Sequence, residues 1–355
     1  MAALFILTQL YAGYFHQERA RLAGKHFSQA SLLADAGDYA LAIEQYRDAL
    51  SYDRANLEYQ LGFAEALYDS GGYQEAGFRL GQLRASDPTN AVVNRLLALL
   101  AQRFGRANEA IGHYRTAVYG RWPADPEQNR IRTRFELIEL LEADGRNGAV
   151  IGELATLLEE ERPDDSLRKL IGFRLLEAKA DEAAERLFEE LTQTIPKDAG
   201  VWEGLGRARL DRGDYRSALP AFERSLAIED DEEVGRLRAL CRGARDLDPN
   251  APRLGLRRRL ERSQALLKRT FAYLDYCVNP FGEAFVGPPA PGSYFELFEA
   301  ARDQLGQRLP RRDQEQALEA NLEMVHGLWD YRNSLCTNVW NEDPALLLLL
   351  GETAR

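Results

Sequence analysis

The sequence is poor in the residues that build metal sites and disulfide frameworks. Its 355 residues include three cysteines and four histidines, and neither set has the spacing of a zinc site. It also lacks a phosphate loop and a nucleophile elbow. We therefore expect no metal, no cofactor and no catalytic function. Cys277 and Cys336 lie near the ends of two long predicted helices, where they form either a disulfide or two buried free thiols.

Positive charge is scarce relative to negative charge. The net charge of −11 argues against nucleic-acid binding, which needs a basic footprint. One basic stretch stands out, with Arg257, Arg258, Arg259 and Arg262 at its centre. Two interpretations remain open for it. It either docks an acidic partner or anionic headgroups, or forms a solvated helix face paired with the acidic run at 229–233, and we favour the second.

Long apolar runs are also lacking, except at the N-terminus. Residues 1–15 carry no Asp, Glu, Lys or Arg, but a membrane-spanning helix needs roughly 20 apolar residues. Residues 1–22 are therefore interpreted either as a shortened anchor in a bacterial-type membrane or as a helix that caps the following domain. The two interpretations predict a membrane-associated and a cytoplasmic protein, respectively.

What the sequence does contain is a repeat. A turn residue recurs at steps of 34, with one step of 40, inside an otherwise helical pattern. A small residue and then a large one follow each turn at fixed distances. The turn residues are Gly37, Gly71, Gly105, Gly145, Lys179 and Gly213, and the small residues are Ala42, Ala76, Ala110, Val150, Ala184 and Ala218. This pattern predicts pairs of antiparallel helices that cross closely where the small residues face each other.

The glycine turn, the small residue and the large residue one helical turn later resemble the tetratricopeptide repeat. The resemblance covers residues 23–232 and implies an all-α, right-handed solenoid of six helical hairpins. We place the repeats at 23–56, 57–90, 91–124, 131–164, 165–198 and 199–232. Because each hairpin buries its faces against its neighbours, the repeats are expected to share one continuous core.

Residues 233–355 are predicted to form a separate helical region that resembles no family we can place. Helices are expected at about 232–246, 252–277, 293–308, 311–337 and 343–353, with a proline- and glycine-rich loop at 279–292. The helix at 252–277 is amphipathic and long, and we expect it to cover the open end of the sixth repeat.

The resemblance implies a non-catalytic scaffold that binds a peptide or helical segment of a protein partner in a concave groove lined by the first helices. By that resemblance, the groove residues are Tyr68, Glu65, Arg95, Gln102, Phe135, Glu139, Lys169, Phe173, Glu203 and Arg207. The Lys/Asn/Arg cluster with which chaperone-binding members grip a terminal carboxylate is missing. Two alternatives stay open: a cell-envelope assembly or secretion accessory that acts through 233–355, and an enzyme with a site between the repeats and the C-terminal helices.

Overall fold

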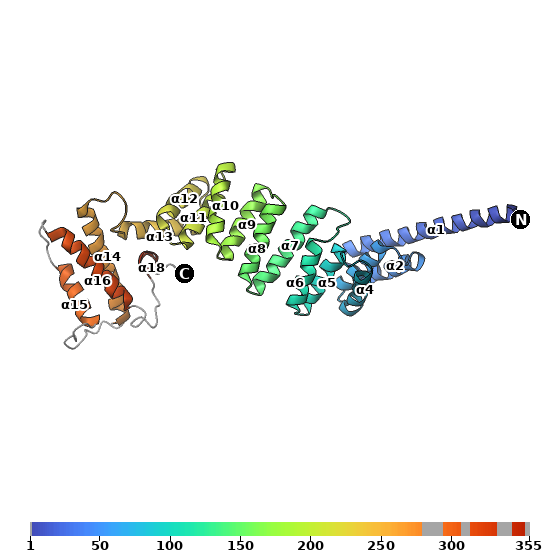
Figure 1. Cartoon of the computed structure of the whole chain (residues 1–355), viewed down its shortest axis with the longest axis horizontal. Helices are drawn as coiled ribbons and strands as arrows, with labels where there is room; N and C mark the ends of the chain where they lie inside the picture. The colour runs from blue at the N-terminus through green and yellow to red at the C-terminus, as the bar shows by residue number, and fades with distance from the viewer. Residues whose placement is uncertain (1, 279–293, 307–312, 332–342, 352–355) are drawn as a thin grey trace. The chain divides into compact units, whose positions relative to one another are not determined.

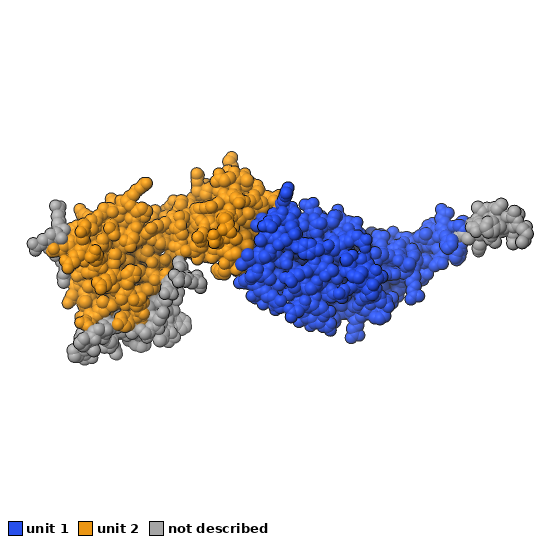
Figure 2. Space-filling view, viewed as in Figure 1, with its two compact units in different colours: residues 1–162 blue, residues 163–355 orange. Residues whose placement is uncertain are grey.

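The computed structural model describes residues 2–278, 294–306, 313–331 and 343–351. The chain divides into two compact units, Met1–Arg162 and Pro163–Arg355, coloured blue and orange in Figure 2. The described residues form seventeen helices and no strand, with one isolated bridge between Asn90 and Arg121. The predicted all-α fold of stacked helical hairpins is confirmed.

The first unit contains four hairpins in which consecutive helices pack side by side (Figure 1). In chain order its helices are α1 (Ala2–Asp35), α2 (Tyr39–Tyr52), α3 (Leu57–Asp69), α4 (Tyr73–Ser86), α5 (Ala91–Arg103), α6 (Ala107–Val118), α7 (Pro126–Ala143) and α8 (Asn147–Glu160). The helix α1 is continuous, so the predicted N-terminal segment 1–22 and the first helix of the first repeat are one element. Tyr14 and Phe15 are 68% and 50% exposed, whereas Ala23 and Ala30 are buried against the first hairpin.

The second unit contains the last two hairpins and the C-terminal region. Its helices are α9 (Asp165–Glu177), α10 (Asp181–Thr194), α11 (Ala199–Asp211), α12 (Tyr215–Ile228), α13 (Glu232–Leu247), α14 (Leu256–Val278), α15 (Tyr294–Gly306), α16 (Gln314–Asp330) and α18 (Pro344–Leu350). The predicted loop at 279–292 lies outside the described residues. The predicted helix 311–337 is shorter than expected in the described part, where it ends at Asp330.

The recurring glycines close the hairpins because they adopt a backbone that other residues rarely reach. Gly37, Gly71, Gly105, Gly145 and Gly213 have φ values between +70° and +86°, in the left-handed region that costs glycine little. Lys179 occupies the equivalent turn of the fifth hairpin at φ +61°. The turn geometry is thus kept in all six hairpins, and it sets the antiparallel pairing of the two helices.

Small side chains lie where the paired helices cross, as predicted from their spacing. Ala30 and Ala42 are fully buried in the first hairpin, and Ala64 and Ala76 are fully buried in the second. In the last hairpin Gly206 faces the Phe222 ring so closely that a Cβ would lie 2.5 Å from Phe222 Cε1. Close helix packing therefore explains why these positions hold alanine or glycine.

The insertion before the fourth repeat, where the step between turn residues is 40 instead of 34, lengthens its first helix. The helix α7 has 18 residues, against 13 in α5, and Pro126 occupies its first turn. Asp125 precedes this helix, where an aspartate often acts as a cap, but its backbone is left-handed (φ 42°) and its side chain makes no capping bond. Pro126 begins the helix without that cap, because proline needs no partner for a backbone N–H at the first helical position.

The sixth repeat is covered by α13, so the expectation that the helix at 252–277 covers it is wrong. Val234, Cys241 and Ala244 of α13 are buried against Tyr215 and Phe222 of α12. This helix therefore continues the stack as a further first helix, and Asp231 accepts a hydrogen bond from Val234 N at its start (2.9 Å). The helix α14 packs instead with α15 and α16, around a core that includes Leu267, Phe298 and Trp329.

Candidate protein-binding surface

Six of the predicted groove residues lie on the first helices of repeats two to four, in the first unit. Glu65 and Tyr68 belong to α3, Arg95 and Gln102 to α5, and Phe135 and Glu139 to α7. Glu65 of α3 interacts electrostatically with Arg95 of α5 and Arg132 of α7, so the three helices approach one another at these side chains. We call this surface the α3–α5–α7 face and define it by Glu65, Tyr68, Asp69, Arg95, Gln102, Arg132, Phe135, Glu136 and Glu139.

The centre of the α3–α5–α7 face is a forked ion pair between two repeats. Arg95 Nε donates to both carboxylate oxygens of Glu136 (3.1 and 2.9 Å), and Arg95 Nη2 donates to Oε1 (2.6 Å). Burial lowers the pKa of Arg95, but the bonds to Glu136 outweigh it and the net pKa is raised. Such a planar, two-point contact orients both side chains firmly. The sequence prediction missed Glu136, which adjoins the predicted Phe135.

Two carboxylates of α3, those of Glu65 and Asp69, lie near this ion pair but do not pair directly with a cation. Glu65 and Asp69 form no ion pair within 4.0 Å with any described residue. The Glu65 residue is partly exposed, but neighbouring atoms keep some water away from its carboxyl group, and this desolvation raises its pKa. The negative charge of Asp69 raises the pKa further, whereas the positive charges of Arg95 and Arg132 lower it. Burial also raises the pKa of Asp69. The face therefore holds negative charge that the protein itself neutralises only in part.

An aromatic series extends from one edge of the face. The Tyr68 ring meets Tyr73 edge-on at 5.5 Å, and Tyr73 meets Phe104 edge-on at 6.0 Å. Arg103 lies 5.5 Å above the Tyr73 ring, and Phe104 remains 49% exposed. The sequence singled out Tyr68 alone, because Tyr73 and Phe104 flank hairpin turns rather than sit inside first helices. Exposed aromatic side chains beside arginine are typical of protein interfaces.

The raised pKa of Glu65 predicts a stability effect that depends on pH. The pKa of this carboxyl is higher in the folded protein than its ordinary value of 4.5. As the pH rises above 4.5, the carboxyl therefore ionises more readily in the unfolded protein, and the folded protein loses stability. Glu65→Gln is expected to remove this loss, so that the change in melting temperature from acidic to neutral pH is more positive in the variant than in the wild type. Thermal unfolding at both pH values measures it. Glu44→Gln, at an exposed site on α2, is the control, and equal pH slopes for the two variants would contradict the assignment.

In the second unit, the predicted residues are engaged with one another or with the core. Lys169 Nζ donates to Asp198 Oδ2 (2.6 Å), and the Phe173 ring packs on the buried Phe188 at 5.2 Å. Arg207 donates to Glu203 (2.8 Å) and to Glu233 at the start of α13 (2.8 Å). Lys169 and Glu203 also line a pocket of about 520 Å³. These residues join consecutive first helices and are less available to a partner than the α3–α5–α7 face.

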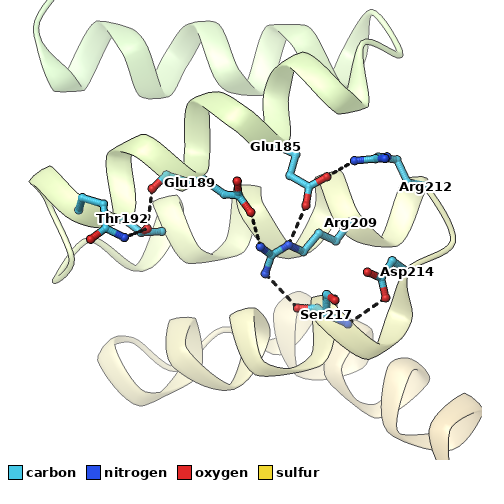
Figure 3. Close-up of polar contacts among 8 residues, drawn as sticks. Glu185, Glu189, Thr192, Arg209, Arg212, Asp214 and Ser217 are labelled. Atoms are coloured by element: carbon cyan, nitrogen blue, oxygen red, sulfur yellow. Dashed lines mark hydrogen bonds and ion pairs between the residues drawn. The ribbon is translucent and has the colours of Figure 1, made fainter. Parts of the chain in front are cut away.

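A further ion cluster of the second unit was absent from the sequence prediction. Arg209 of α11 donates to Glu185 (2.9 Å) and Glu189 (2.5 Å) of α10 and to the Ser217 carbonyl of α12 (3.3 Å), and Arg212 also binds Glu185 (Figure 3). Arg209 is largely buried, so the cluster fastens the fifth repeat to the sixth. Its spacing follows no single helix, which is why sequence periodicity gave no signal for it.

The basic stretch is partly used by the protein itself. Arg262 Nη1 donates to the carbonyls of Arg245 (2.8 Å) and Asp248 (3.1 Å), and Arg259 donates to the Pro249 carbonyl (3.2 Å). These bonds satisfy the C-terminal end of α13, where a cation is favoured. Arg257 pairs with Glu261 on its own helix (3.0 Å), and Arg258 is exposed.

The remaining predicted features concern cysteines, metals and the membrane. Cys336 and the side chain of Cys277 lie outside the described residues, so their predicted pairing stays a prediction. Cys241 is a buried thiol, and burial raises its pKa to about 12. Within the described ranges, no group of three or more His, Cys, Asp or Glu residues is arranged to hold a metal ion. In the same part of the chain, no helix combines the length and apolar character needed to cross a bilayer.

The family comparison supports the repeat assignment directly. Residues 33–100 match the model of the tetratricopeptide repeat. Superkiller complex protein 3 of Mus musculus is 25% identical over 230 residues, which covers 59% of this chain and 14% of that protein. The chain therefore spans about one seventh of the length of this relative.

Two solved structures of tetratricopeptide repeat proteins are also similar to this chain. A tetratricopeptide repeat protein from Parabacteroides merdae is 15% identical, covers 85% of this chain and 99% of its own, and superposes with a TM-score of 0.40. YrrB, described as a TPR protein with an unusual peptide-binding site, is 16% identical and covers 55% of this chain and 97% of its own, with a TM-score of 0.41.

Proposed function

We propose, from the premise that the chain carries tetratricopeptide repeats, that it is a non-catalytic scaffold which binds a segment of a protein partner on the α3–α5–α7 face. The observation that carries this proposal is the pair Glu65 and Asp69, exposed carboxylates one helical turn apart on α3 that form no ion pair within 4.0 Å among the described residues. They lie beside Tyr68 and the Arg95–Glu136 pair, so charge and aromatic surface are offered together.

The chemistry of the face favours a partner segment with cationic and apolar side chains. A lysine or arginine placed between Glu65 and Asp69 would neutralise carboxylates that the fold leaves under-compensated, and this gain offsets its own desolvation. Tyr68 and Phe135 are half-buried, and each offers ring surface to an apolar side chain. An amphipathic helix presents both kinds of side chain three or four residues apart, which makes it the best-matched segment.

Position-specific photo-crosslinking tests this proposal. A photo-reactive phenylalanine analogue is placed at Tyr68, at Phe135 and, as the control, at the exposed Gly112 of α6, where an added Cβ would meet nothing within 4 Å. In cells of the native organism, the first two positions are expected to capture the same protein and the control position is not. Mass spectrometry of the adduct should place the captured segment beside a lysine or arginine.

The charge requirement is tested in the same experiment. Replacing both Glu65 and Asp69 by lysine is expected to lower the crosslinking yield at Tyr68 about tenfold, since like charges then meet across the interface. Capture from Gly112 with equal yield, or a yield at Tyr68 that survives both substitutions, would contradict the proposal. Membrane association through residues 1–15 stays a prediction from the sequence alone, and fractionation of native cells tests it separately.

A further inference from the structure

A second site lies in the first unit, among the second helices of the first two repeats and α3 between them. It is a pocket of about 630 Å³ lined by ten residues, including Arg47, Arg54, Gln60, Phe63 and Arg79. This volume falls within the range of pockets that enclose a ligand or a few residues of a peptide, and it exceeds what a single small ion fills. The α3–α5–α7 face shares no residue with it.

The pocket lining holds three arginines and no carboxylate, and Glu75 is the acidic residue that pairs with two of them. Glu75 is shared between Arg79 Nη2 (3.3 Å) and Arg47 Nη2 (3.7 Å), and both distances are long for charge-assisted hydrogen bonds. Arg79 Nε is buried and finds no hydrogen-bond partner among the described residues. Arg54 forms no ion pair within 4.0 Å in the same part of the chain. One paired carboxylate therefore faces three lining cations, in a protein that is acidic as a whole.

The floor of the pocket holds two of these cations in place. The guanidinium groups of Arg47 and Arg79 lie 5.7 and 5.4 Å from the centre of the Phe63 ring, and that ring is 2% exposed. Cation–π contact orients the arginines without neutralising them. Leu50 and Leu83 add apolar surface to the lining. The site is thus a pre-arranged cationic pocket with an apolar base.

The backbone around the pocket opposes an anion, so the arginine side chains must supply the attraction. The helix α2 ends at Tyr52 and α4 ends at Ser86, close in sequence to the pocket residues Arg54 and Leu83. Helix C-termini carry partial negative charge. Removal of the arginines should therefore abolish anion binding rather than weaken it slightly.

We propose that this pocket binds an acidic segment of a protein, with two carboxylate side chains on Arg47, Arg54 and Arg79 and an apolar side chain between them against the leucines of the base. Carboxylates match the fork of donors on a guanidinium group. A nucleic acid fits less well, because three cations in one pocket form no continuous basic track and Asp48 and Asp53 adjoin them in the sequence. This site is independent of the proposed function, which concerns the opposite charge on a surface that shares α3 with the pocket but none of its lining residues.

Fluorescence anisotropy with the purified full chain tests the proposal. The probe is a fluorescein-labelled peptide, Asp-Glu-Phe-Glu-Asp, and its amide counterpart Asn-Gln-Phe-Gln-Asn is the matched negative probe. The acidic peptide is expected to bind about tenfold or more tightly than the amide peptide, and its affinity should fall as salt is added. Equal affinity for the two peptides, or no binding of either, would overturn the proposal.

Matched variants assign the binding to the pocket. The double variant Arg47→Gln/Arg79→Gln is expected to lower the affinity for the acidic peptide about tenfold or more. Arg54→Glu should lower this affinity to a similar extent, and because Arg54 is exposed, the change should not disturb the core. Arg84→Gln, an exposed arginine of α4 outside the pocket, should leave affinity unchanged. Three results would overturn the proposal: loss of affinity in Arg84→Gln alone, stronger binding of a single-stranded oligonucleotide that also depends on Arg54, or dimerisation of the chain through the pocket arginines.

The same assay separates this site from the α3–α5–α7 face. The variant with lysine at both Glu65 and Asp69 should bind the acidic peptide as the wild type does, because neither residue lines the pocket. Excess inorganic phosphate that displaces the peptide completely would show a site for small anions and would refute the assignment to a protein segment.

Discussion

Replacing Arg134 by methionine is expected to lower the local free energy of unfolding of the fourth repeat by about 3 kcal/mol, at the lower end of the range for breaking a buried ion pair. Arg134 is fully buried on α7, where it donates to Glu160 (2.8 Å) and Glu153 (3.4 Å) of α8 and lies 5.5 Å above the Tyr119 ring. Without the arginine, the Glu153 carboxylate loses its ion pair with Arg134, although the Glu153 side chain is only 15% exposed to water. Hydrogen exchange over residues 126–160 measures the change.

Two further variants show whether burial of the charge causes this loss. Arg115 contacts the same Glu153 carboxylate (3.6 Å) from an exposed position, so Arg115→Met should cost no more than about 0.5 kcal/mol. Adding Glu153→Gln to Arg134→Met should recover part of the stability, because no carboxylate is then left unpaired. If Arg115→Met and Arg134→Met lowered the free energy of unfolding by similar amounts, burial of Arg134 would not be the cause of the loss.

Arg134 also shows what the sequence could have revealed and did not. It occupies the helical stripe of Leu137, Ile138 and Leu141, at three, four and seven residues' distance, and all three are buried. A charge on a core stripe requires buried partners. The identity of those partners was beyond reach, because Glu153 and Glu160 belong to another helix and their approach depends on how α7 and α8 pack.

The repeat architecture was predictable because one local rule recurs. A left-handed turn followed by a small residue fixes each hairpin, and the fifth repeat shows the strength of the rule: Lys179 takes the glycine conformation, while Ala184 and Phe188 keep the register. The end of the stack was harder to predict. The sequence of α13 is not followed by a second helix with the repeat pattern, so it was not recognised as part of the stack. Both α13 and α14 have an apolar stripe, and the stripe alone does not indicate which of the two packs on the sixth repeat.

The candidate surface was predictable only in part. The family resemblance implied Glu65, Tyr68 and Arg95 as groove residues on first helices, but the bond between Arg95 and Glu136 spans 41 residues and crosses the insertion. A groove that runs through all six repeats stays a prediction. The cationic pocket was not predicted, because the family resemblance implies binding residues on first helices, whereas Arg47 and Arg79 lie on second helices.

Gly204→Ala is the second substitution with a large expected effect. A Cβ at this position of α11 would lie 2.2 Å from Phe188 Cζ, far inside van der Waals contact. The Phe188 ring has little room to move, because its tip also lies close to Gly172, where a Cβ would be 2.7 Å from Cζ, and Phe173 packs on it edge-on. Overpacking of this kind costs about 1 to 3 kcal/mol, and we expect a value near the upper end despite the higher helix propensity of alanine.

The sign of the effect distinguishes packing from propensity. Gly152→Ala of α8, where a Cβ meets nothing within 4 Å, is the matched control, and it should stabilise the chain by about 0.5 to 1 kcal/mol. Phe188→Leu frees space beside Gly204, so the double variant should be more stable than the sum of the two single changes predicts. Chemical denaturation with hydrogen exchange over residues 165–211 measures the coupling. Additive effects would mean that the ring of Phe188 does not set the spacing between the fifth and sixth repeats, and that the glycine at position 204 is retained for another reason.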